Sequence, residues 1–190
     1  MKKLYSACLS FGLAAFTFQA FSQSNMVLHI NGEEPTPTAD ITGTHNVTVT
    51  GNVTAVNGEI IMPTGDDYLG ISQFVAGFDI TGPWTASFRC YLTNNLDSVY
   101  FIDWRSNNST GHMHIAYKHY KGVYFSDRAI NGIEGQLIAD SLIIAPNTWV
   151  EIKVTHQNNH FTIYRDNVIT KEADYLGTLS PTSTTTFGYS

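Results

Sequence analysis

Residues 147–167, NTWVEIKVTHQNNHFTIYRDN, decide the fold of this chain. Segment 150–155 (VEIKVT) alternates apolar and polar residues, which is the pattern of a strand with one buried face and one face in water. Segment 157–159 (QNN) then reverses the chain, and the alternation resumes after it. Asp166 and Asn167 mark a second tight turn, because Asn tolerates the left-handed backbone conformation. The pattern therefore predicts a β-hairpin that feeds directly into another hairpin.

Two motifs in this stretch resemble those of laminin-G-like domains, which belong to the concanavalin A-like superfamily. Trp149 opens the alternating strand, as a Trp typically does in that family. Segment 163–167 (IYRDN) is similar to the family's apolar-Tyr-x-Asp-Gly turn, with Asn167 in place of the usual Gly. The substitution is mild, because Asn is the next best residue for that backbone shape.

The resemblance extends toward the N-terminus. Segment 66–71 (DDYLGI) resembles the family's Asp-Tyr-apolar-x-apolar motif, and segment 84–91 (WTASFRCY) resembles the strand that follows it. Together the motifs cover most of residues 26–189. The resemblance implies an all-β fold, a two-sheet antiparallel β-sandwich of the jelly-roll, concanavalin A-like type.

The amino-acid usage favours the same fold class. Thr, Val, Ile, Tyr and Phe are frequent, Gly and Asn recur between short apolar runs, and no window after residue 22 shows helical apolar periodicity. Besides the segments quoted above, this pattern predicts strands at 26–30, 40–43, 47–51, 58–61, 99–104, 112–117 and 123–125.

The first 22 residues have the features of a secretory signal peptide. Lys2 and Lys3 supply the positive end, segment 4–18 is almost free of charge, and Ala20 and Ser22 are small residues at the positions that a signal peptidase inspects. The apolar run is shorter than the roughly 20 residues that a membrane-spanning helix needs. We predict cleavage after Ser22, a single mature domain at 23–190, and a secreted or cell-surface protein of bacterial origin.

Charge and cysteine content narrow the partners and the chemistry. The net charge of −6 includes Lys2 and Lys3, so the predicted mature chain is more acidic still, which disfavours nucleic acid or an anionic membrane surface as partner and favours a neutral or cationic ligand. Cys90 is the one cysteine after residue 22, so the mature chain has no internal disulfide. It continues the apolar alternation of segment 84–90, which indicates a buried small hydrophobic residue rather than a nucleophile.

Segment 112–118 (HMHIAYK) carries the clearest candidate binding residues. Its parity places Met113 and Ile115 on the core face and His112 and His114 on the other face. In concanavalin A-like folds one sheet is concave and often binds glycan there, so the resemblance implies a glycan or cell-surface polysaccharide as partner. Aromatic rings cover the apolar face of a pyranose while polar side chains bond its hydroxyls, although core packing is the alternative role for each aromatic residue. The candidate ligand-binding residues are Tyr100, Trp104, His112, His114, Tyr117 and Tyr120.

Calcium is the candidate cofactor, because the resemblance implies a Ca²⁺ site made of Asp, Asn and backbone oxygens at a loop rim. No candidate falls in a diagnostic spacing such as the EF-hand loop, so no ligand set is predicted. His112 and His114 offer two imidazoles, but without a third ligand we favour histidines that bond hydroxyls over a transition-metal site. Acidic and amide residues at predicted loop ends are Asp66, Asp67, Asp97, Asp103, Asn107 and Asn108.

Two enzymatic alternatives on this fold require recognisable motifs. A retaining glycosidase needs two carboxyl groups roughly 5 Å apart, and enzymes of this fold usually place them on one strand as Glu-x-Asp-x-Glu. No glutamate has an acidic partner two or four residues away on a predicted strand. Jelly-roll polysaccharide lyases use a His and a Tyr, and His114 with Tyr117 or with segment 120–124 (YKGVY) resembles such a site. The arginine-rich strand of those lyases is absent around Arg89.

We therefore predict a secreted, non-catalytic carbohydrate-binding or adhesion module. The alternatives are a carbohydrate-active enzyme on the same scaffold, a glycoside hydrolase or a polysaccharide lyase, and a purely structural interaction domain of a larger surface protein. Segment 187–189 (FGY) resembles the family's apolar-Gly strand, after which most members add one more strand. We expect the sandwich to lack that last strand, so that the chain is a fragment of a longer secreted protein with further domains, or another chain or domain completes the sheet.

Overall fold

The computed structural model is all-β across the residues it describes. The described residues form fifteen strands and no helix, so none of them belongs to a helix that is long and apolar enough to cross a membrane. Most of the predicted signal peptide lies outside the described residues, although Phe21–Ser22 form strand β1, which pairs with β2 (Asn25–Met26). The described residues are 21–22, 25–26, 30, 46–56, 59–63, 67–71, 81–93, 98–105, 112–128, 134–177, 179 and 184–189.

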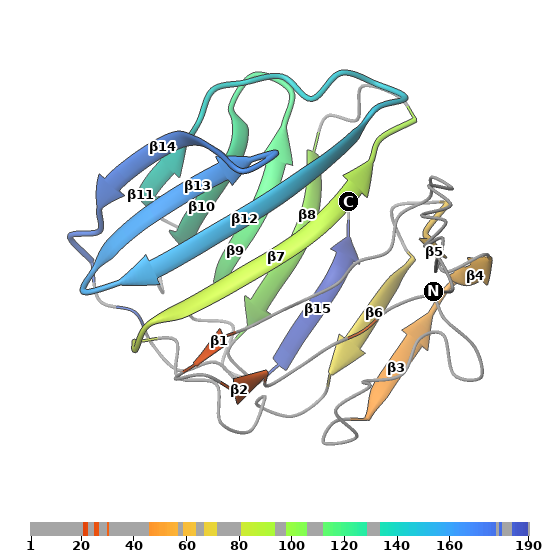
Figure 1. Cartoon of the computed structure of the whole chain (residues 1–190). Helices are drawn as coiled ribbons and strands as arrows, with labels where there is room; N and C mark the ends of the chain where they lie inside the picture. The colour runs from red at the N-terminus through yellow and green to blue at the C-terminus, as the bar shows by residue number, and fades with distance from the viewer. Residues whose placement is uncertain are drawn as a thin grey trace, which may run out of the picture.

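The larger of the two main sheets has seven antiparallel strands in the order β11-β10-β9-β8-β15-β6-β3. Its strands β8 to β11 form a meander, and β15 is inserted between β8 and β6 (Figure 1). The strands predicted at 99–104, 112–117 and 123–125 are confirmed as the first three strands of this meander. The strands are β3 (Val47–Thr50), β6 (Tyr68–Ile71), β8 (Ser98–Arg105), β9 (His112–Lys118), β10 (Gly122–Arg128), β11 (Glu134–Ala139) and β15 (Thr184–Tyr189).

The smaller main sheet contains the stretch that decides the fold. Its order is β14-β13-β12-β7, and the predicted pair of consecutive hairpins is confirmed by β12 to β14. Both hairpin turns use left-handed backbone, at Asn158 and Asn159 (φ 52° and 61°) and at Asp166 and Asn167 (φ 49° and 65°). The strands are β7 (Trp84–Tyr91), β12 (Trp149–Gln157), β13 (His160–Arg165) and β14 (Val168–Asp174).

Two further strands form a separate hairpin, and two of the predicted strands are described only in part or not at all. Strands β4 (Thr54–Val56) and β5 (Glu59–Ile61) pair only with each other. The predicted strand at 26–30 is described only at its ends, where Met26 belongs to β2 and Ile30 is a buried residue in a single bridge. The predicted strand at 40–43 lies outside the described residues.

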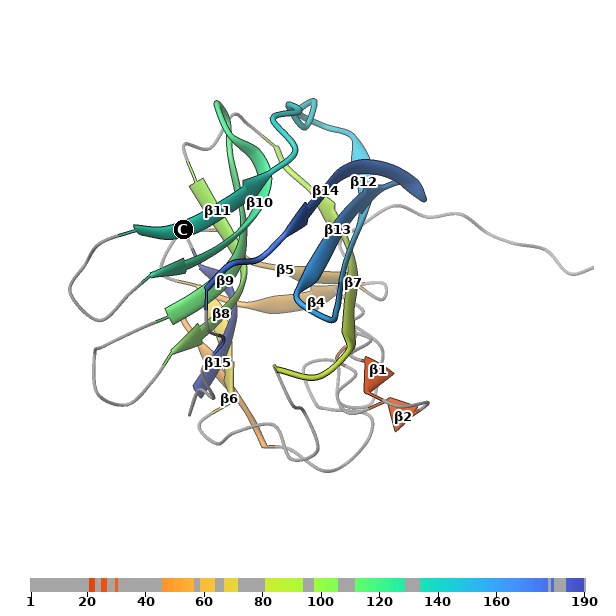
Figure 2. The ribbon, with the colours of Figure 1, turned by 90° about the vertical axis from the view of Figure 1, so that its left-hand side faces the viewer.

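Figure 2 shows the two main sheets facing each other, and aromatic side chains make contacts between them. Phe125 of β10 stacks on Phe161 of β13 with ring centroids 4.1 Å apart. Phe88 of β7 lies 4.7 Å from Phe101 of β8. Such pairs contribute about 0.5–1.5 kcal/mol each beyond the area that they bury. The two sheets therefore form a β-sandwich around one core, as the motifs predicted.

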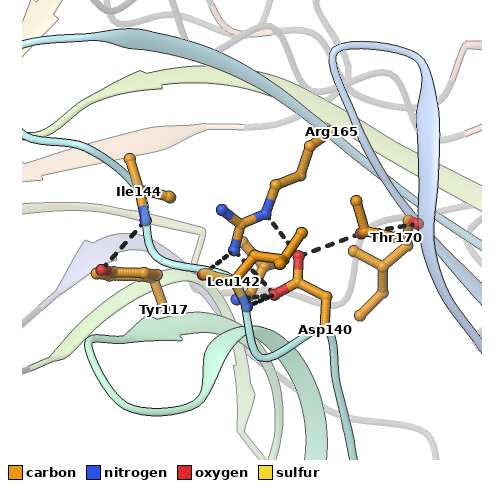
Figure 3. A network of polar contacts seen from close by, with 8 residues as sticks. Tyr117, Asp140, Leu142, Ile144, Arg165 and Thr170 are labelled. Atoms are coloured by element: carbon orange, nitrogen blue, oxygen red, sulfur yellow. Dashed lines mark hydrogen bonds and ion pairs between the residues drawn. The ribbon is translucent and has the colours of Figure 1, made fainter.

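A buried ion pair joins the smaller sheet to the segment that crosses over from the larger one (Figure 3). Asp140 follows β11 and Arg165 ends β13. Arg165 donates from Nε to Asp140 Oδ2 at 2.5 Å and from Nη2 to Asp140 Oδ1 at 2.8 Å. The side chain of Asp140 is fully buried and that of Arg165 is 9% exposed. This two-point geometry is the strong form of an Arg–carboxylate contact.

Further donors saturate the carboxylate of Asp140. The backbone N–H groups of Val123 and Leu142 donate to Oδ1 at 2.9 and 3.0 Å, and the hydroxyl of Thr170 donates to Oδ2 at 3.1 Å. Arg165 also donates to the carbonyl of Leu142. Strands β10, β13 and β14 and the crossover segment thus meet at one carboxylate. A buried charge is tolerated only with such full hydrogen bonding.

We predict that Asp140→Asn lowers the free energy of unfolding by about 3–5 kcal/mol, because it leaves the guanidinium of Arg165 buried without its counter-charge. Chemical denaturation of the folded chain measures this change. Asp174→Asn is the matched control, since Asp174 is exposed and an exposed ion pair is worth about 0–1 kcal/mol. Equal stability of Asp140→Asn and the wild type would contradict the role assigned to the pair.

Cys90 faces the core, as the sequence predicted, and is 1% exposed. Burial raises the pKa of its thiol to about 12, while the charge of Arg165 opposes this rise. Because the thiolate is the reactive form, the native thiol is expected to be inert. In the Cys8→Ser chain, an aromatic disulfide reagent at pH 8 should react only after denaturant is added; rapid reaction of the native protein would show that the core around Cys90 opens.

Candidate functional site

Strand register builds a polar row across the middle of the larger sheet. His114 of β9 is paired with Asp103 of β8 on one side and with Ser126 of β10 on the other. The three residues are 1–6% exposed. In the next row of this face, Ala116 is paired with Tyr100 on β8 and Tyr124 on β10.

This polar row lies on the face of the larger sheet that points away from the smaller one. Met113, Ile115 and Tyr117 of β9 belong to the core between the sheets. Since side chains alternate along a strand, His114 and Ala116 point to the opposite side, and the predicted parity of this strand is confirmed. Figure 2 shows the smaller sheet on one side of the larger one. We call the other side the outer face.

A β-bulge in β8 decides which aromatic residues reach the outer face. The pairing of β8 with β9 shifts between Tyr100 and Ile102, so that Phe101 is the extra residue. As a result Phe101 and Ile102 are both buried in the core, while Tyr100 and Asp103 share the outer face with His114. Bulges redirect side chains in this way, often beside functional sites.

Aromatic rings enclose His114 on the outer face. Its ring lies 5.0 Å from that of Tyr100 and 5.4 Å from that of Tyr124, and both contacts are edge-on. Tyr100 is half-buried and Tyr124 is 4% exposed. Together they combine flat apolar rings with imidazole, carboxylate and hydroxyl groups. We define the outer-face cluster as Tyr100, Asp103, His114, Tyr124 and Ser126.

A basic rim borders the outer-face cluster at the turn between β9 and β10. Tyr120 in this turn is 69% exposed. The Nζ atoms of Lys118 and Lys121 lie 5.4 and 5.9 Å from the centre of its ring. Lys121 Nζ also lies 5.6 Å from the ring centre of Tyr124, which links the rim to the cluster. These distances fit cation–π contacts, which hold the ammonium groups over the rings.

The structure places five of the six predicted ligand-binding residues in three groups and gives only the strand position of the sixth. Tyr100 and His114 belong to the outer-face cluster, and Tyr120 lies at the rim. Trp104 is 5% exposed and contacts Trp84, and Tyr117 is 1% exposed and accepts a hydrogen bond from the N–H of Ile144. Trp104 and Tyr117 therefore pack in the core, which was the alternative role for each aromatic candidate. His112 occupies its predicted strand, while its side chain lies outside the description.

The sequence-based predictions did not include Ser126, and they included Tyr124 only within segment 120–124 of the lyase alternative. Both lie on β10, where Val123 and Phe125 alternate with them and are buried in the core. The same period-2 rule that located His114 on β9 would have found them on the next strand. Asp103 was noticed only as a possible calcium ligand.

The calcium prediction concerns residues that the structure describes only in part. Asp67 is buried, and its Oδ1 accepts a hydrogen bond from the N–H of Asn52 at 2.5 Å. Among the described side chains, no group of three or more His, Cys, Asp or Glu residues is placed to hold a metal ion. The candidates Asp66, Asp97, Asn107 and Asn108 lie outside the described residues, so a calcium site stays a prediction.

One carboxylate pair escaped the sequence analysis, because the strand that carries it was not delimited. Glu172 and Asp174 lie two residues apart on β14. Their side chains are 53% and 77% exposed, and both approach His160, whose Nδ1 is 2.7 Å from Asp174 Oδ1. This hydrogen bond raises the pKa of His160. The prediction that no glutamate has an acidic partner two residues away on a strand is therefore wrong. However, these two carboxylates lie exposed on an edge strand of the smaller sheet.

Comparisons with known proteins agree with the architecture. No protein-family model matches the sequence, and no curated protein matches it. Solved structures do match, and the fold is that of laminin-G-like domains and other concanavalin A-like jelly rolls. Domains LG4-5 of the mouse laminin alpha1 chain align with 63% of this chain and 31% of theirs, at 9% identity and a TM-score of 0.50.

Two further structures align over more of this chain. Domain 4 of AbnA, a GH43 extracellular arabinanase from Geobacillus stearothermophilus in complex with arabinotriose, has a TM-score of 0.64 and 10% identity, covering 92% of this chain and 84% of that chain. The binding domain of botulinum neurotoxin DC in complex with SialylT has a TM-score of 0.57 and 21% identity, covering 78% of this chain. The match spans 39% of the toxin chain. At these identities the likeness establishes the fold.

Proposed function

We propose that this chain is a secreted, non-catalytic carbohydrate-binding or adhesion module that holds a glycan on the outer face of its larger sheet. The observation that carries the proposal is the outer-face cluster. In it, His114 is enclosed by Tyr100 and Tyr124 and paired across strands with Asp103 and Ser126.

The chemistry of the cluster suits a sugar. The half-buried ring of Tyr100 offers an apolar surface for the C–H face of a pyranose, and exposed Tyr120 offers a second one at the rim. The polar groups of the cluster are only 1–6% exposed. The carboxylate of Asp103 accepts hydrogen bonds, the hydroxyl of Ser126 both donates and accepts, and His114 does either according to its tautomer. Sites with a few polar groups among aromatic side chains are typical of small-ligand binding.

The solved structures with the same fold support this assignment. The arabinanase domain is in complex with arabinotriose and the toxin domain with SialylT. The arabinanase is extracellular, which agrees with a signal peptide at residues 1–22 and a mature domain at 23–190. Bacterial origin, calcium and further domains of a longer chain are parts of the same proposal.

A second candidate function is polysaccharide cleavage by a lyase, because one observation favours it. The rings of His114 and Tyr124 are neighbours on adjacent strands, and β-elimination uses a base and an acid that lie close together. Tyr117 and segment 120–124 were the predicted partners of His114 for this role; Tyr124 ends that segment, whereas Tyr117 lies in the core. A purely structural interaction domain is the third possibility, and it requires no glycan at all.

We predict that the chain binds at least one soluble polysaccharide in a screen that includes neutral and acidic glycans. Tyr100→Ala should weaken this binding roughly tenfold, which corresponds to about 1.4 kcal/mol for a lost stacking contact. Tyr164→Ala is the matched control, since Tyr164 lies on β13 of the smaller sheet with Lys153 Nζ 4.2 Å from its ring centre.

Each arm of this experiment has a distinct outcome. Loss of binding in chelator supports a calcium site, while new reducing ends or unsaturated sugar ends indicate an enzyme and overturn the non-catalytic assignment. Equal weakening by Tyr100→Ala and Tyr164→Ala would move the site away from the outer face. Absence of binding to every glycan would leave the structural domain as the better account.

A further inference from the structure

Basic residues occupy the β9–β10 turn at one end of the outer-face cluster and the paired strand positions at its other end. At the end nearest the β9–β10 turn lie Lys118 and Lys121, with their ammonium groups over the ring of Tyr120. At the other end, strand register pairs His112 with Arg105 on β8 and with Arg128 on β10. This row is two residues along each strand from the row of Asp103, His114 and Ser126, and so has the same parity.

The local charge of this region is opposite to that of the whole chain. The chain has a net charge of −6 with ten Lys and Arg residues in all. Four of these ten, Arg105, Lys118, Lys121 and Arg128, lie in strands β8 to β10 or in the β9–β10 turn. Whole-chain charge therefore does not describe the surface that a ligand of the cluster would meet.

Few carboxylates offset these cations within the three strands, although register pairs Arg128 with Glu134 of the neighbouring strand β11. Segments 98–105 and 112–128 contain two acidic residues, Asp103 and Asp127. Asp127 accepts a hydrogen bond from the hydroxyl of Tyr175, whose ring packs against Phe125 in the core. Asp127 is thus engaged on the core side of the sheet, and Asp103 is the one carboxylate of the outer-face cluster.

The distance between the basic ends sets the size of the ligand. His112 and Lys118 are six residues apart on β9, which corresponds to about 20 Å at roughly 3.3 Å per residue. A ligand that contacts both ends is an oligosaccharide rather than a single sugar. Its acidic groups would meet the cations while its rings lie over Tyr100 between them.

We infer that the ligand of the outer-face cluster is an acidic polysaccharide, one that carries carboxylate or sulfate groups along its chain. This inference rests on the proposed function and names its substrate class. It replaces the neutral or cationic ligand that net charge alone favours.

The test compares acidic polysaccharides with neutral versions of the same backbone. The full chain is titrated with polygalacturonate and its fully methyl-esterified form, and with carrageenan and its desulfated form. We expect the acidic member of at least one pair to bind roughly tenfold more tightly, with an affinity that falls as salt is added. Neutral polysaccharides from the general glycan screen are titrated in parallel.

Charge variants locate the contact. Lys118→Gln with Lys121→Gln, and separately Arg105→Gln with Arg128→Gln, should each reduce acidic-glycan binding roughly fivefold or more. The matched control is Lys153→Gln with Lys171→Gln, which removes two charges from the smaller sheet and should leave binding unchanged. Thermal unfolding of each variant shows whether it is folded; because the two test pairs are independent, one folded pair is sufficient.

The outcomes separate this inference from the proposed function. Equal binding of both members of each pair, a preference for neutral glycans, or equal loss in the control variant overturns the acidic ligand while glycan binding stands. Failure to bind any glycan, neutral or acidic, overturns the proposed function and this inference together.

Discussion

The contact between Asp140 and Arg165 connects the architecture of this protein to its candidate site. Arg165 ends the second strand of the hairpin pair, and Asp140 begins the crossover from the larger sheet. The same carboxylate accepts the N–H of Val123, and the N–H of Ser141 donates to the carbonyl of Lys121 at 2.9 Å. The network therefore fixes the start of β10 and the turn that carries the basic rim. A buried pair of this kind contributes little net stability by itself, but removing one partner is costly.

Backbone conformation around this network is equally constrained. Gly122 has φ +76°, and a Cβ there would lie 2.2 Å from Asp140 Oδ1. Any other residue at position 122 would thus be strained and would also displace the carboxylate. The close approach of the β9–β10 turn to Asp140 explains how a surface-exposed rim is held by a fully buried group. It also places Lys121 where its ammonium group reaches the ring of Tyr124.

Much of the fold could be predicted from sequence because its signals are local. Both hairpin turns are predicted by residues that tolerate left-handed backbone, namely Asn158, Asn159, Asp166 and Asn167. The alternation of apolar residues on β9 likewise placed His114 on the face opposite the core. Strict alternation along β8 would put Tyr100 and Trp104, both predicted as ligand-binding residues, on one face. The bulge at Phe101 separates them, and nothing local in the sequence reveals a bulge.

Contacts between segments far apart in the chain could not be predicted from local sequence patterns. Asp140 and Arg165 are 25 residues apart and meet only once both sheets are formed. The insertion of β15 between β8 and β6 likewise joins distant segments. The basic ends of the outer face become visible only when strand register aligns Arg105, His112 and Arg128 in one row. The net charge of −6 predicted a neutral or cationic ligand instead, because it averages charge over the whole chain.

Hydroxyl-radical footprinting of the chain, with and without a polysaccharide that it binds, tests the central claim most directly. Tyrosines report on both sheets, with Tyr100 and Tyr120 on one side and Tyr91 and Tyr164 on the other. The account predicts that the bound glycan protects Tyr100 and Tyr120 from oxidation and leaves Tyr91 and Tyr164 unchanged. Protection of Tyr91 and Tyr164 with Tyr100 and Tyr120 unaffected would contradict it and place the ligand on the smaller sheet.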